Sequence, residues 1–221
     1  MKTNKIKNIR PKNDIDLSEI LLEGVDESTA NLQLPDPDLL TYYKDLQNRT
    51  IWLDDEVTMS SIDLGKLILH WNREDAGIPV EERKPIKFLL FTPGGTLDSC
   101  FNLISIISLS KTPVYTYNMG LAMSAGFLLL LAGHKRFTLD NATALMHSGS
   151  GGTKGTYDQV QAQQEDYKHS IDYMYKFIEG HTKLTKKMLT KMKKDDTYFY
   201  ADDMIEYGIV DKVIDNIDEI L

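Results

Sequence analysis

Apolar and polar positions alternate along the chain in blocks that predict strands followed by helices. Five apolar runs have the length of a strand: residues 50–53, 86–91, 114–117, 136–138 and 144–146. Three segments carry apolar residues at intervals of three or four, as amphipathic or buried helices do: residues 57–72, 97–109 and 124–131. Glycine-containing turns separate several of these blocks. The alternation predicts an α/β fold whose strands pair mainly in parallel.

The second half of the chain is predicted to be mainly helical. A glycine-rich stretch at residues 149–155 precedes a long helix over residues 157–179, with an apolar stripe at intervals of three, four or seven. A helix of this length in a small domain often packs on another subunit. Four further elements are predicted, helices at 186–192 and 202–207 and apolar strand-like runs at 198–200 and 209–214.

The pattern predicts one domain preceded by an arm. Residues 1–38 are mostly polar, and Pro35 and Pro37 stop a helix at that point. Residues 1–48 are therefore expected to form an N-terminal arm with one short helix. Residues 49–221 are expected to form a single domain, since no internal repeat is present.

Charge and composition exclude several classes of protein. The chain has 25 basic and 33 acidic residues, a net charge of −8, which argues against a general nucleic-acid binder. The longest apolar stretch, residues 127–132, is too short to cross a membrane, and no apolar segment follows the basic N-terminus as in a secretory signal. The single cysteine, Cys100, fits a reducing compartment. We therefore expect a cytoplasmic protein that binds neither nucleic acid nor membranes.

Two residues have the setting of a nucleophile and its base. Ser124 lies between a predicted strand-ending turn at Gly120 and a helix start, where unpaired backbone N–H groups favour an anion. His147 ends the strand at 144–146 and could accept the proton of a serine on a neighbouring turn. Taken singly, each has a structural alternative, an N-cap serine and a hydrogen-bonded structural histidine.

Two further features could complete such a site. The glycines of Thr92-Pro93-Gly94-Gly95 could point backbone N–H groups at a developing oxyanion, although Pro-Gly is also frequent in ordinary turns. Asp195 or Asp196 could orient His147, or the pair could simply be solvated. No histidine and cysteine residues have the spacing of metal ligands, and no cofactor is expected.

Taken together and in this order, these segments resemble the ClpP family, the proteolytic subunit of the Clp protease. Its Ser-Pro-Gly-Gly turn is matched by Thr92-Pro93-Gly94-Gly95, and its Met-Ile-His by Leu145-Met146-His147. Other matching segments are residues 120–126, 129–133, 135–137, 151–155, 196–201 and 206–211. The resemblance spans about residues 50–214.

The resemblance implies a ClpP/crotonase-like spiral of strand–turn–helix units with a protruding helical handle, in a ring-forming serine endopeptidase. The residues it implies fall into three groups: a catalytic triad of Ser124, His147 and Asp196; oxyanion donors on Gly95 and Ala125; and substrate-binding positions at Gly94, Gly149, Gly151 and Gly152. Substrate would add a strand along residues 149–155.

The resemblance also implies an assembly and partners. The expected state is a homo-oligomer of heptameric rings stacked in pairs, with the helix at 157–179 between rings. Such a chamber would cleave unfolded proteins or short peptides and would be supplied by an AAA+ unfoldase. Two other functions fit the same features: a phage-type head-maturation protease, and an idle ring subunit that only scaffolds active ones. One departure from the family is Lys194-Asp195, where the charges of an acidic-Arg pair are exchanged.

Overall fold

The computed structural model describes residues 37–192 and 195–221, and the chain divides into two units, Met1–Thr41 and Tyr42–Leu221. Of the first unit, only the beginning of helix α2 (Pro37–Gln47) is described. The hydrophobic pattern does not single out α2. Its first residue is Pro37, which suits the start of a helix because no N–H partner is needed there. Most of the predicted arm lies outside the described residues, so the arm and the domain boundary stay predictions.

Seven strands in the described part of the chain form one sheet, in the order β1-β2-β3-β4-β7, with β5 paired to β3 and to β6. Their bounds are β1 Thr50–Leu53, β2 Ile86–Thr92, β3 Val114–Met123, β4 Lys135–Leu139, β5 Thr143–Met146, β6 Thr197–Phe199 and β7 Lys212–Ile214. Every pair is parallel except β5 with β6. The predicted α/β class with mainly parallel pairing is confirmed.

Strand β3 differs from its prediction in a way that positions the site. It continues through Gly120, where the sequence predicts a turn, so the predicted turn is wrong. Gly120 has φ of 139°, which a residue without Cβ adopts readily, and the register with β2 is irregular beside it. The first part of β3 pairs with β4, whereas Leu121, Ala122 and Met123 pair with β5. The end of β3 is thereby aligned with β5.

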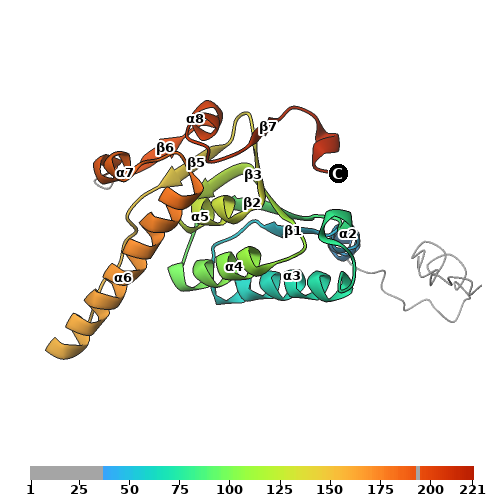
Figure 1. Cartoon of the computed structure of the whole chain (residues 1–221). Coiled ribbons are helices and arrows are strands. Elements are labelled where there is room, and N and C mark those ends of the chain that lie inside the picture. The colour runs from blue at the N-terminus through green and yellow to red at the C-terminus, as the bar shows by residue number, and fades with distance from the viewer. Residues whose placement is uncertain (1–36, 193–194) are drawn as a thin grey trace, which may run out of the picture. The chain divides into compact units, whose positions relative to one another are not determined.

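The helices follow the predicted pattern closely. The main ones are α3 Ile62–Glu74, α4 Leu97–Leu109, α5 Ala125–Ala132 and α6 Tyr157–His181. The shorter elements are α7 Lys186–Met192, α8 Ala201–Glu206 and the 3-10 turns Met59–Ser61, Val80–Glu82 and Ile217–Glu219. Helices α3 and α4 lie side by side, and α5 packs between α4 and β3 (Figure 1).

Helix α5 explains the apolar run at residues 127–132. All of its residues are buried, so the run forms a core helix covered on every side. Among the described residues, no helix has both the length and the hydropathy of a membrane span. The long helix α6 is different, because its first half is exposed and its burial is concentrated at Met174, Tyr175, Phe177 and Ile178. Figure 1 shows α6, in orange, projecting away from the sheet.

Apolar side chains cover both faces of the sheet. Side chains on successive strand residues point to opposite faces, and both Phe88 and Leu89 in β2 are buried. Phe88 joins the main core with the buried faces of α3, α4 and α5. Leu89 joins a smaller cluster with Tyr117, Ile214 and Ile220.

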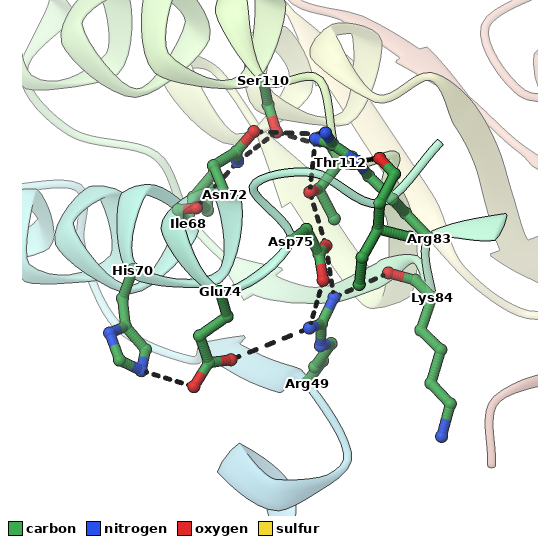
Figure 2. A network of polar contacts seen from close by, with 11 residues as sticks. Arg49, Ile68, His70, Asn72, Glu74, Asp75, Arg83, Lys84, Ser110 and Thr112 are labelled. Atoms are coloured by element: carbon green, nitrogen blue, oxygen red, sulfur yellow. Dashed lines mark hydrogen bonds and ion pairs between the residues drawn. The ribbon is translucent and has the colours of Figure 1, made fainter. Parts of the chain in front are cut away.

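An ion pair between a partly exposed arginine and a buried aspartate joins the start of β1 to the end of α3 (Figure 2). Both Nη atoms of Arg49 lie 2.7 Å from the carboxylate oxygens of Asp75, which is 2% exposed. The Thr112 hydroxyl, just before β3, donates to Asp75 at 2.7 Å. The Arg49 guanidinium hydrogen bond lowers the pKa of Asp75, so the carboxylate is charged at neutral pH. The network ties three segments that are distant in sequence.

Candidate active site

Ser124 occupies a strained turn between β3 and α5. Its φ of 54° is in the left-handed region, which side chains with a Cβ rarely adopt. Its N–H donates to the carbonyl of Leu145 at 2.9 Å, which extends the pairing of β3 with β5 by one residue. The turn therefore holds the serine side chain at the end of the strand, and backbone strain of this kind is found at functional sites.

His147 directly follows β5, the strand that pairs with the end of β3. This pairing places the imidazole beside Ser124, with Nε2 2.7 Å from Oγ. Its side chain is 26% exposed, so the ring is reachable from solvent on one side. The two residues that the sequence suggested as nucleophile and base, 23 positions apart, are in hydrogen-bond contact.

Asp196 is close to His147 but does not hydrogen-bond to it. Strand β6 runs antiparallel to β5 and pairs Thr197 with Met146, which brings the preceding Asp196 towards the imidazole. The distance from Asp196 Oδ1 to His147 Nδ1 is 3.9 Å, beyond hydrogen-bond range, and the carboxylate side chain is 59% exposed. Asp195 donates its N–H to the carbonyl of Met192. Lys194, its partner in the predicted charge pair, lies outside the described residues.

The two glycines after β2 lie against this turn. Val57 N–H donates to the Gly94 carbonyl at 2.7 Å, and Thr96 N–H donates to the Val57 carbonyl at 2.9 Å, so residues 94–96 run beside Val57 as a short extended segment. Within the described residues, the N–H groups of Gly95 and of Ala125, the first residue of α5, have no hydrogen-bond acceptor. Unpaired backbone N–H groups of this kind are what binding of a negatively charged oxygen requires.

A larger residue in place of Gly94 would force the turn to move. It has φ of 101°, and an added Cβ would lie 2.6 Å from the Met123 carbonyl oxygen and 2.7 Å from Ser124 Cβ. Gly94→Ala should lower the free energy of unfolding by at least about 1–2 kcal/mol from the positive φ alone. It should also lower reactivity at Ser124. Chemical denaturation, with activity measured on the same sample, checks both effects.

A matched control for this substitution is Gly180→Ala in α6, where an added Cβ meets nothing within 4 Å. Alanine has the higher helix propensity, so this variant should be as stable as the wild type or up to about 1 kcal/mol more stable. Equal stability of the two variants would contradict the close contact assigned to Gly94.

A cavity of about 390 Å³ opens beside Ser124 and His147. Its floor is apolar, formed by Phe127, Leu128, Met146, Met174 and Ile178. Gly95 and Gly149 also line it, whereas Gly151 and Gly152 line a separate hollow beside Tyr167. The glycine-rich segment 149–155, for which the resemblance implied a strand, forms no strand in this structure. A segment is a strand only when it pairs with another one. The expected partner of residues 149–155 is a bound substrate, which this structure does not contain.

Cys100 is buried, and its thiol donates to the carbonyl of Ala125 at 3.3 Å. Burial raises the pKa of this thiol well above its usual range, which makes it a poor nucleophile. Among the described residues, no group of three or more histidine, cysteine, aspartate or glutamate side chains could hold a metal ion.

Sequence reasoning missed one contact at the site. The hydroxyls of Ser148 and Tyr175 lie 2.7 Å apart, which links the residue after His147 to α6. The apolar stripe of α6 includes Met174 and Ile178 but gives no sign that Tyr175 faces Ser148. No local pattern could have found a contact between residues 27 positions apart.

The chain is similar to known proteins over most of its length. The Clp protease family model matches residues 39–217. The ATP-dependent Clp protease proteolytic subunit 2 of Rhodococcus jostii is 31% identical over 193 residues, covering 85% of this chain and 93% of the relative. The corresponding subunit 2 of Corynebacterium diphtheriae is 32% identical over 196 residues, covering 86% and 92%. That of Treponema pallidum is 30% identical over 176 residues, covering 79% and 86%. Because the family model and these relatives match most of the chain, the chain belongs to the Clp protease family, whose members are peptidases.

Proposed function

We propose that this chain is a serine endopeptidase that cleaves unfolded proteins or short peptides, with Ser124 as nucleophile, His147 as base and Asp196 as the orienting acid. The observation that carries the proposal is the 2.7 Å contact between Ser124 Oγ and His147 Nε2 at a strained strand-to-helix turn. A serine that only capped a helix would not need an imidazole within hydrogen-bond range, and the Ser124 side chain makes no capping hydrogen bond to α5.

In the proposed mechanism, His147 Nε2 takes the proton of Ser124 as Oγ attacks the peptide carbonyl carbon. The resulting oxyanion accepts hydrogen bonds from the N–H groups of Gly95 and Ala125. His147 then gives the proton to the leaving amine nitrogen, and the C–N bond breaks to leave an acyl ester on Ser124. A water, deprotonated by His147, attacks the ester, and the proton returns to Ser124 as the acid product leaves.

Asp196 has a less direct part in this mechanism. At 3.9 Å it attracts a protonated His147 electrostatically, and closing to a hydrogen bond on Nδ1 would hold the ring in the tautomer that leaves Nε2 free. Catalytic hydrogen bonds are often long without substrate and shorten in the substrate complex.

The proposed assembly is a homo-oligomeric chamber of heptameric rings that is supplied by an AAA+ unfoldase. The relatives are named as ATP-dependent proteolytic subunits, which supports a multi-subunit enzyme with an ATPase partner. The exposed first half of α6 offers a surface for contact between subunits. Glycine positions 94, 149, 151 and 152 are proposed to lie along the bound peptide.

A fluorophosphonate probe tests the proposal directly. It phosphonylates only an activated serine, and intact-mass analysis counts the adducts on wild type, Ser124→Ala and His147→Ala. One adduct on wild type and none on the variants is the expected result. An adduct that survives Ser124→Ala would place the nucleophile elsewhere. No adduct on wild type that sizing shows to be assembled would refute the peptidase and leave a scaffold subunit.

A further inference from the structure

The chain on the two sides of His147 is held in different ways. On the N-terminal side, β5 is paired with β3 on one edge and with β6 on the other, so Met146 has a fixed position. On the C-terminal side, residues 147–156 belong to no helix or strand. Strand β5 therefore fixes His147 from its N-terminal side, and the contacts of the next residue, Ser148, hold it from the other side.

Helix α6 contacts Ser148 through tyrosine side chains. The Tyr175 hydroxyl lies 2.7 Å from Ser148 Oγ, and the Tyr167 hydroxyl donates a longer hydrogen bond, of 3.5 Å, to the Ser148 carbonyl. Tyr175 is only 7% exposed and belongs to the turns of α6 that pack into the core. Its hydroxyl is thus presented from the packed part of the helix, whereas Tyr167 lies in the exposed part.

The contact is well suited to resist movement. Displacement of Ser148 would break the 2.7 Å hydrogen bond with the Tyr175 hydroxyl, and a hydrogen bond lost in a buried setting costs free energy. Burial raises the pKa of Tyr175 further above neutral pH, so the hydroxyl stays protonated there, as an ordinary tyrosine does. The neighbouring residues Met174 and Ile178 form part of the cavity floor beside Ser124. The same turns of α6 therefore shape the cavity and hold Ser148.

We propose that Tyr175, acting through the Ser148 hydroxyl, is a positioning residue that keeps His147 within hydrogen-bond range of Ser124. This inference rests on the proposed peptidase function. Tyr175 touches neither nucleophile nor base, so its effect is on the alignment of His147. A misplacement of about 1 Å in a catalytic group lowers rates by up to roughly 100-fold, so a single lost contact has a measurable effect.

Substitutions that remove one hydroxyl test the proposal. Tyr175→Phe and Ser148→Ala should each lower kcat for a short peptide roughly three- to tenfold, the value of one hydrogen bond, with little change in KM. Ser148→Thr keeps the hydroxyl and should restore most of the rate. The matched control is Tyr173→Phe on the same helix, whose ring contacts Phe101 and whose side chain is 45% exposed. It should leave kcat unchanged.

The double variant distinguishes a shared contact from two separate effects. If both hydroxyls act through one hydrogen bond, the double variant of Tyr175→Phe and Ser148→Ala should have about the same kcat as the less active of the two single variants. A double variant whose loss is the product of the two single losses would overturn the proposal. So would a Tyr175→Phe rate equal to that of Tyr173→Phe.

The fluorophosphonate reaction separates failure of this inference from failure of the proposed function. If wild type does not react with the probe, the peptidase assignment fails and this inference fails with it. If wild type reacts and Tyr175→Phe reacts at the same rate, only the positioning role is refuted. A slower reaction of Tyr175→Phe, with an unchanged unfolding midpoint, supports the role and excludes general destabilisation.

Discussion

Replacing Ser124 with alanine should lower kcat for peptide hydrolysis by about 10⁴- to 10⁶-fold, the loss expected when a serine nucleophile that works with a histidine is removed. Only background hydrolysis promoted by the oxyanion donors and substrate binding would remain. His147→Ala should be similarly damaging, because Ser124 Oγ has its proton acceptor 2.7 Å away in that residue. The rates are measured with a short fluorogenic peptide on protein of confirmed assembly state.

The double variant and a surface control make this prediction stricter. Ser124→Ala with His147→Ala should lose no more than either single variant, because the two residues act as a unit. Ser105→Ala removes a hydroxyl on α4 that donates to the Phe101 carbonyl of its own helix, and it should leave the rate unchanged. A Ser124→Ala variant that retains a tenth of the wild-type rate would refute the assignment.

Asp196→Asn should have a smaller effect than either of these changes. Its carboxylate is 3.9 Å from Nδ1 and largely exposed, so water already screens its interaction with the imidazolium. We expect a loss below that of His147→Ala and above that of Asp195→Asn, because among the described residues it is Asp196 whose carboxylate pairs with the imidazole, at 3.9 Å. A larger effect at Asp195 would exchange the roles of the two residues.

Breaking the pair of Arg49 and Asp75 should cause the largest loss of stability. Arg49→Met leaves the Asp75 carboxylate, 2% exposed, without its cation, and losing one member of a buried pair lowers the free energy of unfolding by about 3–5 kcal/mol. Lys66→Met is the matched control, since its pair with Asp63 is 69% exposed on both sides and is worth at most about 1 kcal/mol. Urea unfolding followed by tryptophan fluorescence measures both, and similar losses would contradict the difference in burial.

The same pair predicts a dependence of stability on pH. The Arg49 hydrogen bond lowers the pKa of Asp75 in the folded chain below its ordinary value of 3.8. The unfolded state then binds the proton more readily than the folded state. The contribution of the Asp75 carboxylate to the free energy of unfolding is therefore complete above its ordinary pKa, and it is lost as the pH falls through its pKa in the folded chain. Arg49→Met should therefore flatten the acid limb of the wild-type stability curve. An unchanged acid limb in the variant would show that other carboxyl groups determine it.

The order and type of the elements could be predicted because hydrophobic spacing reports which side chains are buried locally. Helix α4 has the predicted bounds, and strands β1 and β2 agree within one residue, since each is a clear apolar block between turns. The predicted strand at 114–117 is shorter than β3 because Gly120 has the signature of a turn. Its pairing with both β4 and β5 overrides that local preference.

The sequence by itself determined the α/β class, the candidates Ser124 and His147, and the glycine turn beside them, because residue type and local spacing carry that information. Spacing left Asp195 and Asp196 as alternatives, and the resemblance to the ClpP family selected Asp196. Only the tertiary structure decided how these groups meet. The 2.7 Å contact of Ser124 with His147, the 3.9 Å gap to Asp196 and the bond between Ser148 and Tyr175 all join residues far apart in the chain. Such distances depend on how strands align and how helices pack, and no periodicity along the chain records them.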